Sequence, residues 1–138
     1  MERPSARDQA RVLDGARLLV VEDEFIILLE LESLLLEAGA AGVRLCRTVA
    51  EAMRHVEQAD EAYGAAVLDV RVGQNNVAPV ARALERRGVP FVFYTGQTAN
   101  DPIRTEWPKC EILSKPSPAR TITATLARLI DERARLAG

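Results

Sequence analysis

The 138-residue sequence is poor in cysteine, with only Cys46 and Cys110, which are far apart and belong to no paired motif. Without cysteine pairs, the chain has neither the spacing of a zinc site nor that of a disulfide framework. This usage is typical of proteins from a reducing cytosol. We interpret both cysteines as small buried apolar residues near strand ends.

Long apolar runs are also lacking. The most apolar segment, Phe25 to Leu36, is interrupted by Glu30 and Glu32, and a bilayer span needs about 20 apolar residues. The N-terminal stretch, Met1 to Ala16, is rich in Arg and Asp and has no apolar core, so it is not a signal peptide. We therefore expect a soluble cytoplasmic protein with no membrane partner.

An excess of positive charge is the third absence. The formal net charge is −2 and the sequence pI is near 5.5, which argues against a nucleic-acid partner. The length and the 48% hydrophobic share fit one globular domain. We predict an N-terminal extension over residues 1–16 and one domain over residues 17–138, with no output domain on the same chain.

Short apolar runs alternate with amphipathic helical patterns along this domain. The alternation predicts an α/β fold with a mostly parallel sheet and right-handed crossovers. The third and fourth runs are nearly continuous in apolar residues, as in strands that are buried on both faces. The predicted strands are Arg17–Val21, Val43–Cys46, Ala65–Val70, Pro90–Tyr94 and Glu111–Leu113.

Capping signals mark the ends of several predicted helices. Thr48 followed by Glu51 is a capping box for a helix that ends near residue 59. Gly88 lies where a C-terminal cap glycine belongs, after a helix that starts near residue 77. Ser117 and Pro118 form a cap and first position for the last helix, which runs to about residue 137.

The fourth crossover is irregular because Pro102 and Pro108 are both unsuited to a helix interior. Only a short helix, about Ile103 to Trp107, fits between them. We expect this crossover helix to be short or partly unwound.

Polar residues fall at the ends of four predicted strands. Glu22 and Asp23 follow the first strand, Asp69 ends the third, Thr95 ends the fourth, and Lys115 follows the fifth. The carboxyl ends of parallel strands meet at one edge, where ligands bind at the switch point of strand order. These residues therefore form the candidate site.

Three converging carboxylates are costly at neutral pH unless a cation joins them. Carboxylate oxygens suit Mg²⁺, which also binds phosphate oxygens. An aligned carboxylate can attack phosphorus, while Lys115 and the Thr95 hydroxyl can bind phosphoryl oxygens. The set contains the parts required for phosphoryl transfer to an aspartate.

The sequence resembles the receiver domain of response regulators in two-component signalling, over about Arg17 to Ala137. Any one motif is weak, but four in order at matching strand ends are specific. The resemblance implies a flavodoxin-like, doubly wound five-stranded sheet of order 2-1-3-4-5 with helices on both faces. The motifs are Val20-Val21-Glu22-Asp23-Glu24, Val67-Leu68-Asp69-Val70, Tyr94-Thr95-Gly96 and Leu113-Ser114-Lys115-Pro116.

The resemblance also assigns roles. Asp69 would accept a phosphoryl group from a sensor histidine kinase or a histidine phosphotransfer protein, with Mg²⁺ or Mn²⁺ as cofactor. Asp23 and Asp69 would ligate the metal, with Glu22 acting largely through water and the backbone carbonyl of Arg71 as a further ligand. Such a domain works as a switch or as a phosphate sink. It modifies only itself, so we expect no enzyme activity on a released substrate.

In the same comparison Thr95 and Lys115 become the phosphoryl contacts. The segment Pro90 to Gly96 is similar to a subgroup of stand-alone receivers with a Phe-Ala-Thr-Gly-Tyr-like signature, although Tyr94 replaces its small residue. Ile112 departs from the pattern because many receivers carry a switching Tyr or Phe there. The usual coupling of the threonine to an aromatic rotamer is therefore not expected.

Two other functions stay open. A pseudo-receiver would bind partners without phosphorylation, which the intact acidic pair argues against. An aspartyl-phosphate phosphatase would place its nucleophile on the first strand with another Asp two positions later. Asp23 is followed by Glu24 and Phe25, so that signature is missing.

Two features lie outside the candidate site. The single histidine, His55, lies on the second predicted helix, and we interpret it as an exposed helical residue. The first helix carries one apolar face and a second stripe, which is more than a core face needs. A helix wedged deeply between its neighbours is one explanation, and a partner or dimer surface is the other; we predict a homodimer through that helix. The face is Ile27, Leu28, Leu31, Leu34 and Leu35, and the stripe is Phe25, Leu29 and Leu36.

Overall fold

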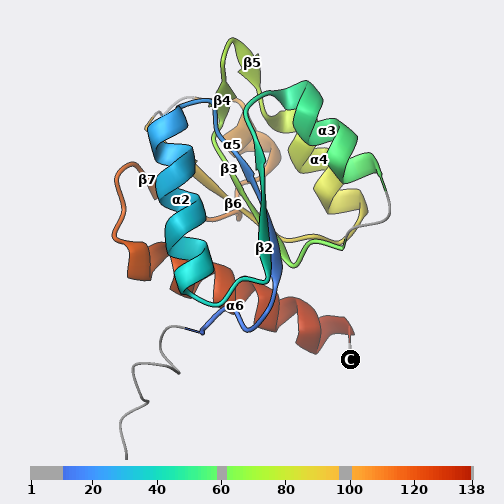
Figure 1. Ribbon diagram of the computed structural model, residues 1–138. Helices are drawn as coiled ribbons and strands as arrows, with labels where there is room; N and C mark the ends of the chain where they lie inside the picture. The colour runs from blue at the N-terminus through green and yellow to red at the C-terminus, as the bar shows by residue number, and fades with distance from the viewer. Residues whose placement is uncertain (1–10, 59–61, 97–100, 138) are drawn as a thin grey trace, which may run out of the picture.

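The computed structural model describes residues 11–58, 62–96 and 101–137. Its main sheet has five parallel strands in the order β2-β1-β3-β6-β7, which confirms the predicted order 2-1-3-4-5 (Figure 1). The predicted strand ends are right to within two residues. The strands are β1 (Arg17–Val21), β2 (Gly42–Cys46), β3 (Ala65–Leu68), β6 (Phe91–Thr95) and β7 (Ile112–Ser114).

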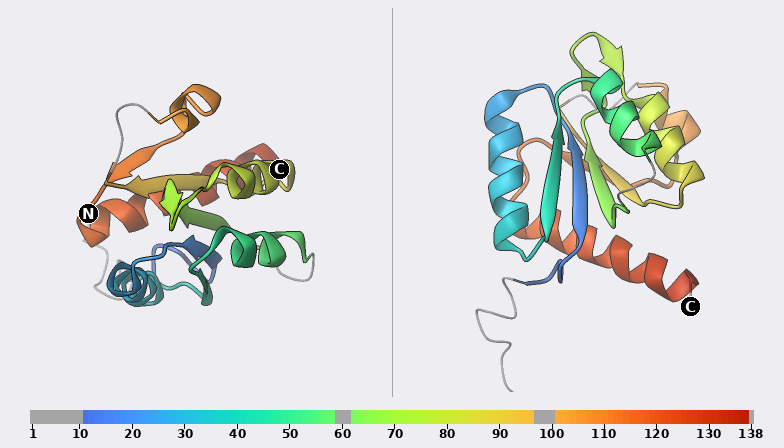
Figure 2. Two further views of the ribbon diagram at one scale, coloured as in Figure 1. Left: turned by 90° about the horizontal axis from the view of Figure 1, so that it is seen from above. Right: turned by 45° about the vertical axis from the view of Figure 1, so that its right-hand side comes forward.

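Helices cover both faces of this sheet, so the doubly wound, flavodoxin-like architecture is confirmed (Figure 2). Helices α2 and α6 pack on one face, and α3, α4 and the short α5 pack on the other. The helices are α2 (Phe25–Glu37), α3 (Val49–Glu57), α4 (Ala78–Arg86), α5 (Ile103–Glu106) and α6 (Ala119–Ala137). Within the described ranges, none of them is long and apolar enough to cross a membrane.

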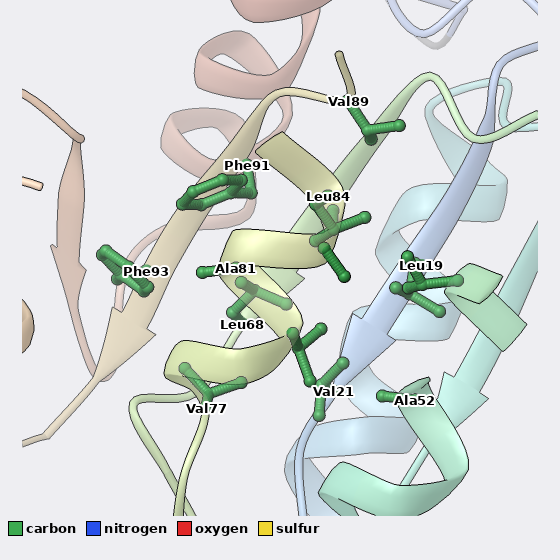
Figure 3. Close-up of a cluster of buried hydrophobic side chains, with 14 of the residues drawn as sticks. Leu19, Val21, Ala52, Leu68, Val77, Ala81, Leu84, Val89, Phe91 and Phe93 are labelled. Atoms are coloured by element: carbon green, nitrogen blue, oxygen red, sulfur yellow. The ribbon is translucent and has the colours of Figure 1, made fainter. Parts of the chain in front are cut away.

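Successive side chains of β1 point to opposite faces of the sheet, so this strand contributes to both hydrophobic cores. Leu19 and Val21 point into the core under α3 and α4, while Leu18 and Val20 point into the core under α2 and α6. All four are fully buried, which explains why a central parallel strand reads as a continuous apolar run. Figure 3 shows the first of these cores, with Leu84 of α4 facing the β1 side chains.

Two helix caps form as predicted. The Thr48 hydroxyl accepts the Glu51 N–H at 3.0 Å at the start of α3. Gly88 follows α4 with a φ of +70°, and Val89 N–H donates to the Leu84 carbonyl at 2.9 Å. These contacts form a Schellman motif, which needs a left-handed residue after the helix.

The predicted serine cap of the last helix is wrong. The Ser117 hydroxyl donates to the Ser114 carbonyl at 2.7 Å, and α6 begins at Ala119. The Pro118 carbonyl instead accepts the Ile122 N–H at 3.2 Å. The serine therefore closes the turn after β7, and the chain enters the helix one residue later.

A short hairpin, β4 (Arg71–Val72) with β5 (Asn75–Asn76), follows β3 and was not predicted. Its turn contains Gly73 with a φ of +64°. In Figure 1 this hairpin projects beyond the carboxyl edge of the sheet. Strand β3 is correspondingly shorter than the predicted Ala65–Val70.

The short fourth crossover helix is confirmed as α5, and Trp107 anchors it. The indole ring packs edge-on against Phe91 and Phe93, with centroid distances of 6.0 and 6.1 Å. Its N–H donates to the Glu85 carboxylate at 3.0 Å. A single large side chain thus seals the core beneath a helix of one turn.

The first described residues pack on the domain rather than extending from it. Leu13 is buried beneath α2, and its N–H donates to the Ala38 carbonyl at 2.9 Å. Gly39 has a φ of +100°, and a Cβ there would lie 2.8 Å from the Arg11 Cα. The turn after α2 therefore requires glycine both for its backbone conformation and for this close approach.

We predict that Gly39→Ala destabilises the protein more than Gly88→Ala. Gly88 has open space around its missing Cβ, so alanine there costs only the left-handed conformation, about 1–2 kcal/mol. Gly39→Ala adds a steric clash with backbone. Urea unfolding of the two variants measures the difference in stability. Equal losses of stability would contradict the close approach of the Arg11 backbone to Gly39.

Candidate functional site

The carboxyl ends of the central strands bring the predicted polar residues together. Val21 of β1 pairs in register with Leu68 of β3, so Glu22 and Asp69 leave neighbouring strands side by side. Thr95 ends β6 on the other side of Asp69. Glu22, Asp69 and Thr95 are 1%, 7% and 2% exposed, so these three side chains are almost completely buried.

Lys115 reaches this group from the loop after β7. Its ammonium lies 2.9 Å from the Asp69 carboxylate and 2.5 Å from the Glu22 carboxylate. Its own N–H donates to the Thr95 carbonyl at 3.1 Å, and the following bond to Pro116 is cis. Lysine thus links the two buried acids in this structure.

Three carboxylates form an acidic cluster: oxygens of Glu22, Asp23 and Asp69 lie within 4.8 Å of one another. One ammonium cannot balance three carboxylates. The oxygen-only donor set fits a hard divalent cation such as Mg²⁺. The residues that the sequence assigned to the metal are therefore placed so that their side chains can share one ion.

Burial raises the pKa of Glu22 to about 7, against the lowering effect of Lys115 and of the Glu24 N–H, which donates to Glu22 at 3.0 Å. The charge of Asp69 raises it further. Burial alone would lower the pKa of Lys115, but its bonds to Glu22 and Asp69 raise it instead, so it stays an ammonium. Burying charge in this site therefore acts mainly on Glu22, whose pKa rises.

The hairpin contributes a contact that the sequence reasoning missed. Gly73 N–H donates to the Asp23 carboxylate at 3.0 Å. The Arg47 guanidinium donates to the Asp23 carbonyl at 3.2 Å. The Gly73 N–H therefore orients the carboxylate of Asp23. The only signal for this contact in the sequence is a glycine shortly after the third strand.

Tyr94 is the second missed residue. It is buried, and its hydroxyl accepts the Ser117 N–H at 3.3 Å. The Lys115 ammonium lies 5.9 Å from the centre of its ring. Tyrosine at this position therefore supports the loop that carries the lysine, and the sequence showed only that it replaces a smaller residue.

Arg71 points toward the start of α5. Its guanidinium lies 3.8 Å from the Asp101 carboxylate, and its side chain is half exposed. Asp101 also accepts the Ile103 N–H at 2.9 Å and the Asn76 amide at 3.2 Å. The hairpin and α5 are thus joined across the mouth of the site. The predicted metal contact through the Arg71 carbonyl stays a prediction.

Neither cysteine is suited to act as a nucleophile. Burial raises the pKa of the Cys46 and Cys110 thiols to about 12 in each case. Cys46 is fully buried at the end of β2, as predicted, and Cys110 is half-buried near β7.

Comparison with known proteins identifies the fold. No family model and no curated protein matches the sequence. A response regulator receiver protein from Sinorhizobium medicae has a TM-score of 0.77 and 27% identity, covering 88% of this chain and 98% of its own.

Two further structures agree. A CheY-like receiver domain protein from Methanospirillum hungatei has a TM-score of 0.76 and 20% identity, covering 87% and 97% of the two chains. The non-phosphorylated HemR receiver domain from Leptospira biflexa has a TM-score of 0.69 and 25% identity, covering 83% and 94%.

The parallel sheet with an acidic cluster and a lysine at its carboxyl edge has the flavodoxin-like fold of the CheY type. The solved structures that this chain resembles are response-regulator receiver domains, the family that its sequence motifs resemble.

We predict that Glu22→Gln stabilises the metal-free protein at neutral pH. Folding raises the pKa of Glu22 from 4.5 to about 7, so the folded state prefers the neutral carboxyl. The wild type therefore keeps its full stability below pH 4.5 and loses up to about 3 kcal/mol as pH rises to 7. The amide of Glu22→Gln carries no charge at any of these pH values, so the variant avoids this loss of stability.

Urea unfolding in a chelator, from pH 4.5 to 8, measures the effect. The two proteins should be similar at the acidic end and diverge toward pH 7. Glu30→Gln, on the exposed face of α2, is the matched control and should change stability by less than about 0.5 kcal/mol. A pH-independent difference between Glu22→Gln and wild type would contradict the prediction.

Proposed function

We propose that this receiver domain accepts a phosphoryl group on Asp69 from the phosphohistidine of a sensor histidine kinase or a histidine phosphotransfer protein, in a Mg²⁺-dependent reaction. The observation that carries the proposal is the bridge from Lys115 to Asp69 and Glu22 inside the acidic cluster. Mn²⁺ has the same preference for oxygen ligands.

A carboxylate oxygen of Asp69 attacks the phosphorus, the phosphorus–nitrogen bond breaks, and the histidine of the donor leaves. Mg²⁺, held by Asp23 and Asp69 with Glu22 acting through water and the Arg71 carbonyl as a further ligand, would neutralise charge on the phosphoryl oxygens. Burial of Asp69 limits the access of water to the acyl phosphate that results.

Lys115 changes partner in this reaction. Without a phosphoryl group its ammonium forms ion pairs with Asp69 and Glu22. Once Asp69 becomes an acyl phosphate, its carboxyl group loses its own charge, and the ammonium can bind a phosphoryl oxygen instead. Thr95, at the end of β6, supplies a hydroxyl for another oxygen. The exchange of ion pairs is the local event through which phosphorylation changes this edge.

The proposed protein is a switch or a phosphate sink, and its only catalysis is its own phosphorylation and dephosphorylation. Ile112 on β7 is aliphatic and packs against the core under α3 and α4. Any output therefore cannot use an aromatic rotamer at that position. The cytoplasmic location and the relation to Phe-Ala-Thr-Gly-Tyr-like receivers stay predictions.

Intact-protein mass after incubation with Mg²⁺ and acetyl phosphate tests the proposal. We expect one added phosphoryl group on the wild type and none on Asp69→Asn or in a chelator. Asp131→Asn, an exposed acid paired with Arg135 on α6, is the matched control and should be phosphorylated normally. An adduct on Asp69→Asn would exclude Asp69 as the acceptor.

A short acyl-phosphate lifetime could hide the adduct, so beryllium fluoride binding, followed by fluorine NMR, is the second measurement. Binding by the wild type and not by Asp69→Asn would support the proposal. Failure of both measurements would favour a pseudo-receiver that binds partners without phosphorylation.

We further propose that a second copy of the chain binds at α2. Its inner face is buried as predicted, through Leu28, Leu31 and Leu35. Its outer face exposes large apolar side chains, of which Ile26 is 73% exposed, and a two-fold axis would bury this patch twice. The exposed set is Phe25, Ile26, Leu29 and Leu36.

Sedimentation over a wide concentration range tests this dimer. We expect a concentration-dependent dimer in the wild type and a monomer in Ile26→Glu. Glu30→Gln, on the same helix, should leave the association unchanged. A monomeric wild type at high concentration, with and without phosphorylation, would exclude the dimer.

A further inference from the structure

A second cluster of metal-ligating side chains lies between the end of β2 and α3. The Cys46 sulfur, a Glu51 carboxylate oxygen and a His55 imidazole nitrogen all lie within 4.8 Å of one another. Glu51 and His55 are four residues apart on α3, so they share one face of the helix. Cys46 is the last residue of β2, and the cap at Thr48 fixes where the helix starts relative to it.

Glu51 and the cationic side chains of Arg44 and Arg54 act electrostatically on the Cys46 thiol. Among the residues that the structure describes, the carboxylate of Glu51, the imidazole of His55 and the thiol of Cys46 make no hydrogen bond or ion pair. Glu51 and His55 are half-buried, and Cys46 is fully buried.

The donor set differs in kind from that of the acidic cluster. Thiolate, imidazole and carboxylate together are the ligands of Zn²⁺, whereas oxygen ligands alone suit Mg²⁺. A thiolate and a carboxylate would also balance the charge of one divalent ion. The alternative, a cysteine that only fills the core, explains the burial of Cys46 but not the two ligands facing it.

The spacing is close to that of a tetrahedral site. Zinc–sulfur and zinc–nitrogen bonds of about 2.3 and 2.0 Å place neighbouring ligand atoms about 3.3–3.8 Å apart. Separations of at most 4.8 Å therefore need a closure of about 1 Å. Glu51 and His55 can provide it by side-chain rotation, because both reach partly into solvent.

We propose that Cys46, Glu51 and His55 form a second metal site that binds Zn²⁺, with water in the fourth position. On binding, the thiol S–H bond breaks, its proton passes to solvent, and the sulfur–zinc bond forms. The three ligands come from one strand end and one helix, so the ion ties α3 to β2.

This site would adjoin the acidic cluster. Cys46 pairs in register with Val21, and the Cys46 carbonyl accepts the Glu22 N–H at 2.9 Å. Zinc at Cys46 therefore fixes the strand end that holds the backbone of Glu22. The zinc site does not depend on phosphorylation of Asp69, because its ligands and its ion differ from those of the acidic cluster.

Titration of the metal-free protein with Co²⁺, followed by absorption spectroscopy, tests the site. A thiolate ligand gives a sulfur-to-cobalt charge-transfer band that an oxygen-only cluster cannot give. We expect one Co²⁺ per chain with this band, and its displacement by Zn²⁺. Cys46→Ser should abolish the band, and Cys110→Ser, the matched cysteine control, should keep it.

His55→Gln keeps the thiol and alters a half-exposed helix position, so it tests the ligand set even if Cys46→Ser folds poorly. We expect it to weaken Co²⁺ binding at least about 10-fold, since even outer partners of metal ligands are worth that much. Glu51→Gln should weaken binding in the same direction. Absence of the band in the wild type, or unchanged binding in His55→Gln, would overturn the proposal.

Discussion

The constraint on which this structure depends is the burial of negative charge at the carboxyl edge of the sheet. Parallel pairing of β1 with β3 brings Glu22 and Asp69 side by side, with Asp23 at the next position. A single ammonium, that of Lys115, lies against the two buried acids. The raised pKa of Glu22 shows that burial outweighs this pairing. The edge therefore holds electrostatic strain that a cation or a change of charge on Asp69 would relieve.

The surrounding scaffold keeps that edge in place. Two aliphatic cores fix the central strands from both faces, so the acids cannot separate without breaking the sheet. On one side of the site, the Arg82 guanidinium forms two hydrogen bonds with Glu106, at 2.7 and 2.8 Å, and lies over the Trp107 ring. This clamp holds the one-turn helix α5 against α4. The helix α5 is therefore short but firmly attached.

Contacts from the loops support the residues at the carboxyl edge. Tyr94 supports the lysine loop, and the hairpin after β3 contacts both Asp23 and Asp101, through Gly73 and Asn76. The hairpin therefore connects the acidic cluster with the start of α5.

The sequence by itself determined the strand order, the two-sided covering of the sheet, the short fourth crossover and the residues at the carboxyl edge. Each follows from a local signal: apolar runs between helical patterns, prolines that exclude a longer helix, and polar residues at strand ends. It did not place the hairpin at Gly73 or the turn of Ser117, because their contacts, although local, leave no repeating pattern in the sequence. The support from Tyr94 could not be predicted because it depends on a contact between distant segments. Only the tertiary structure brought Cys46 to Glu51 and His55. The cysteine count alone argued against zinc, because a ligand set drawn from a strand end and a helix face has no recognisable spacing until the two are packed together.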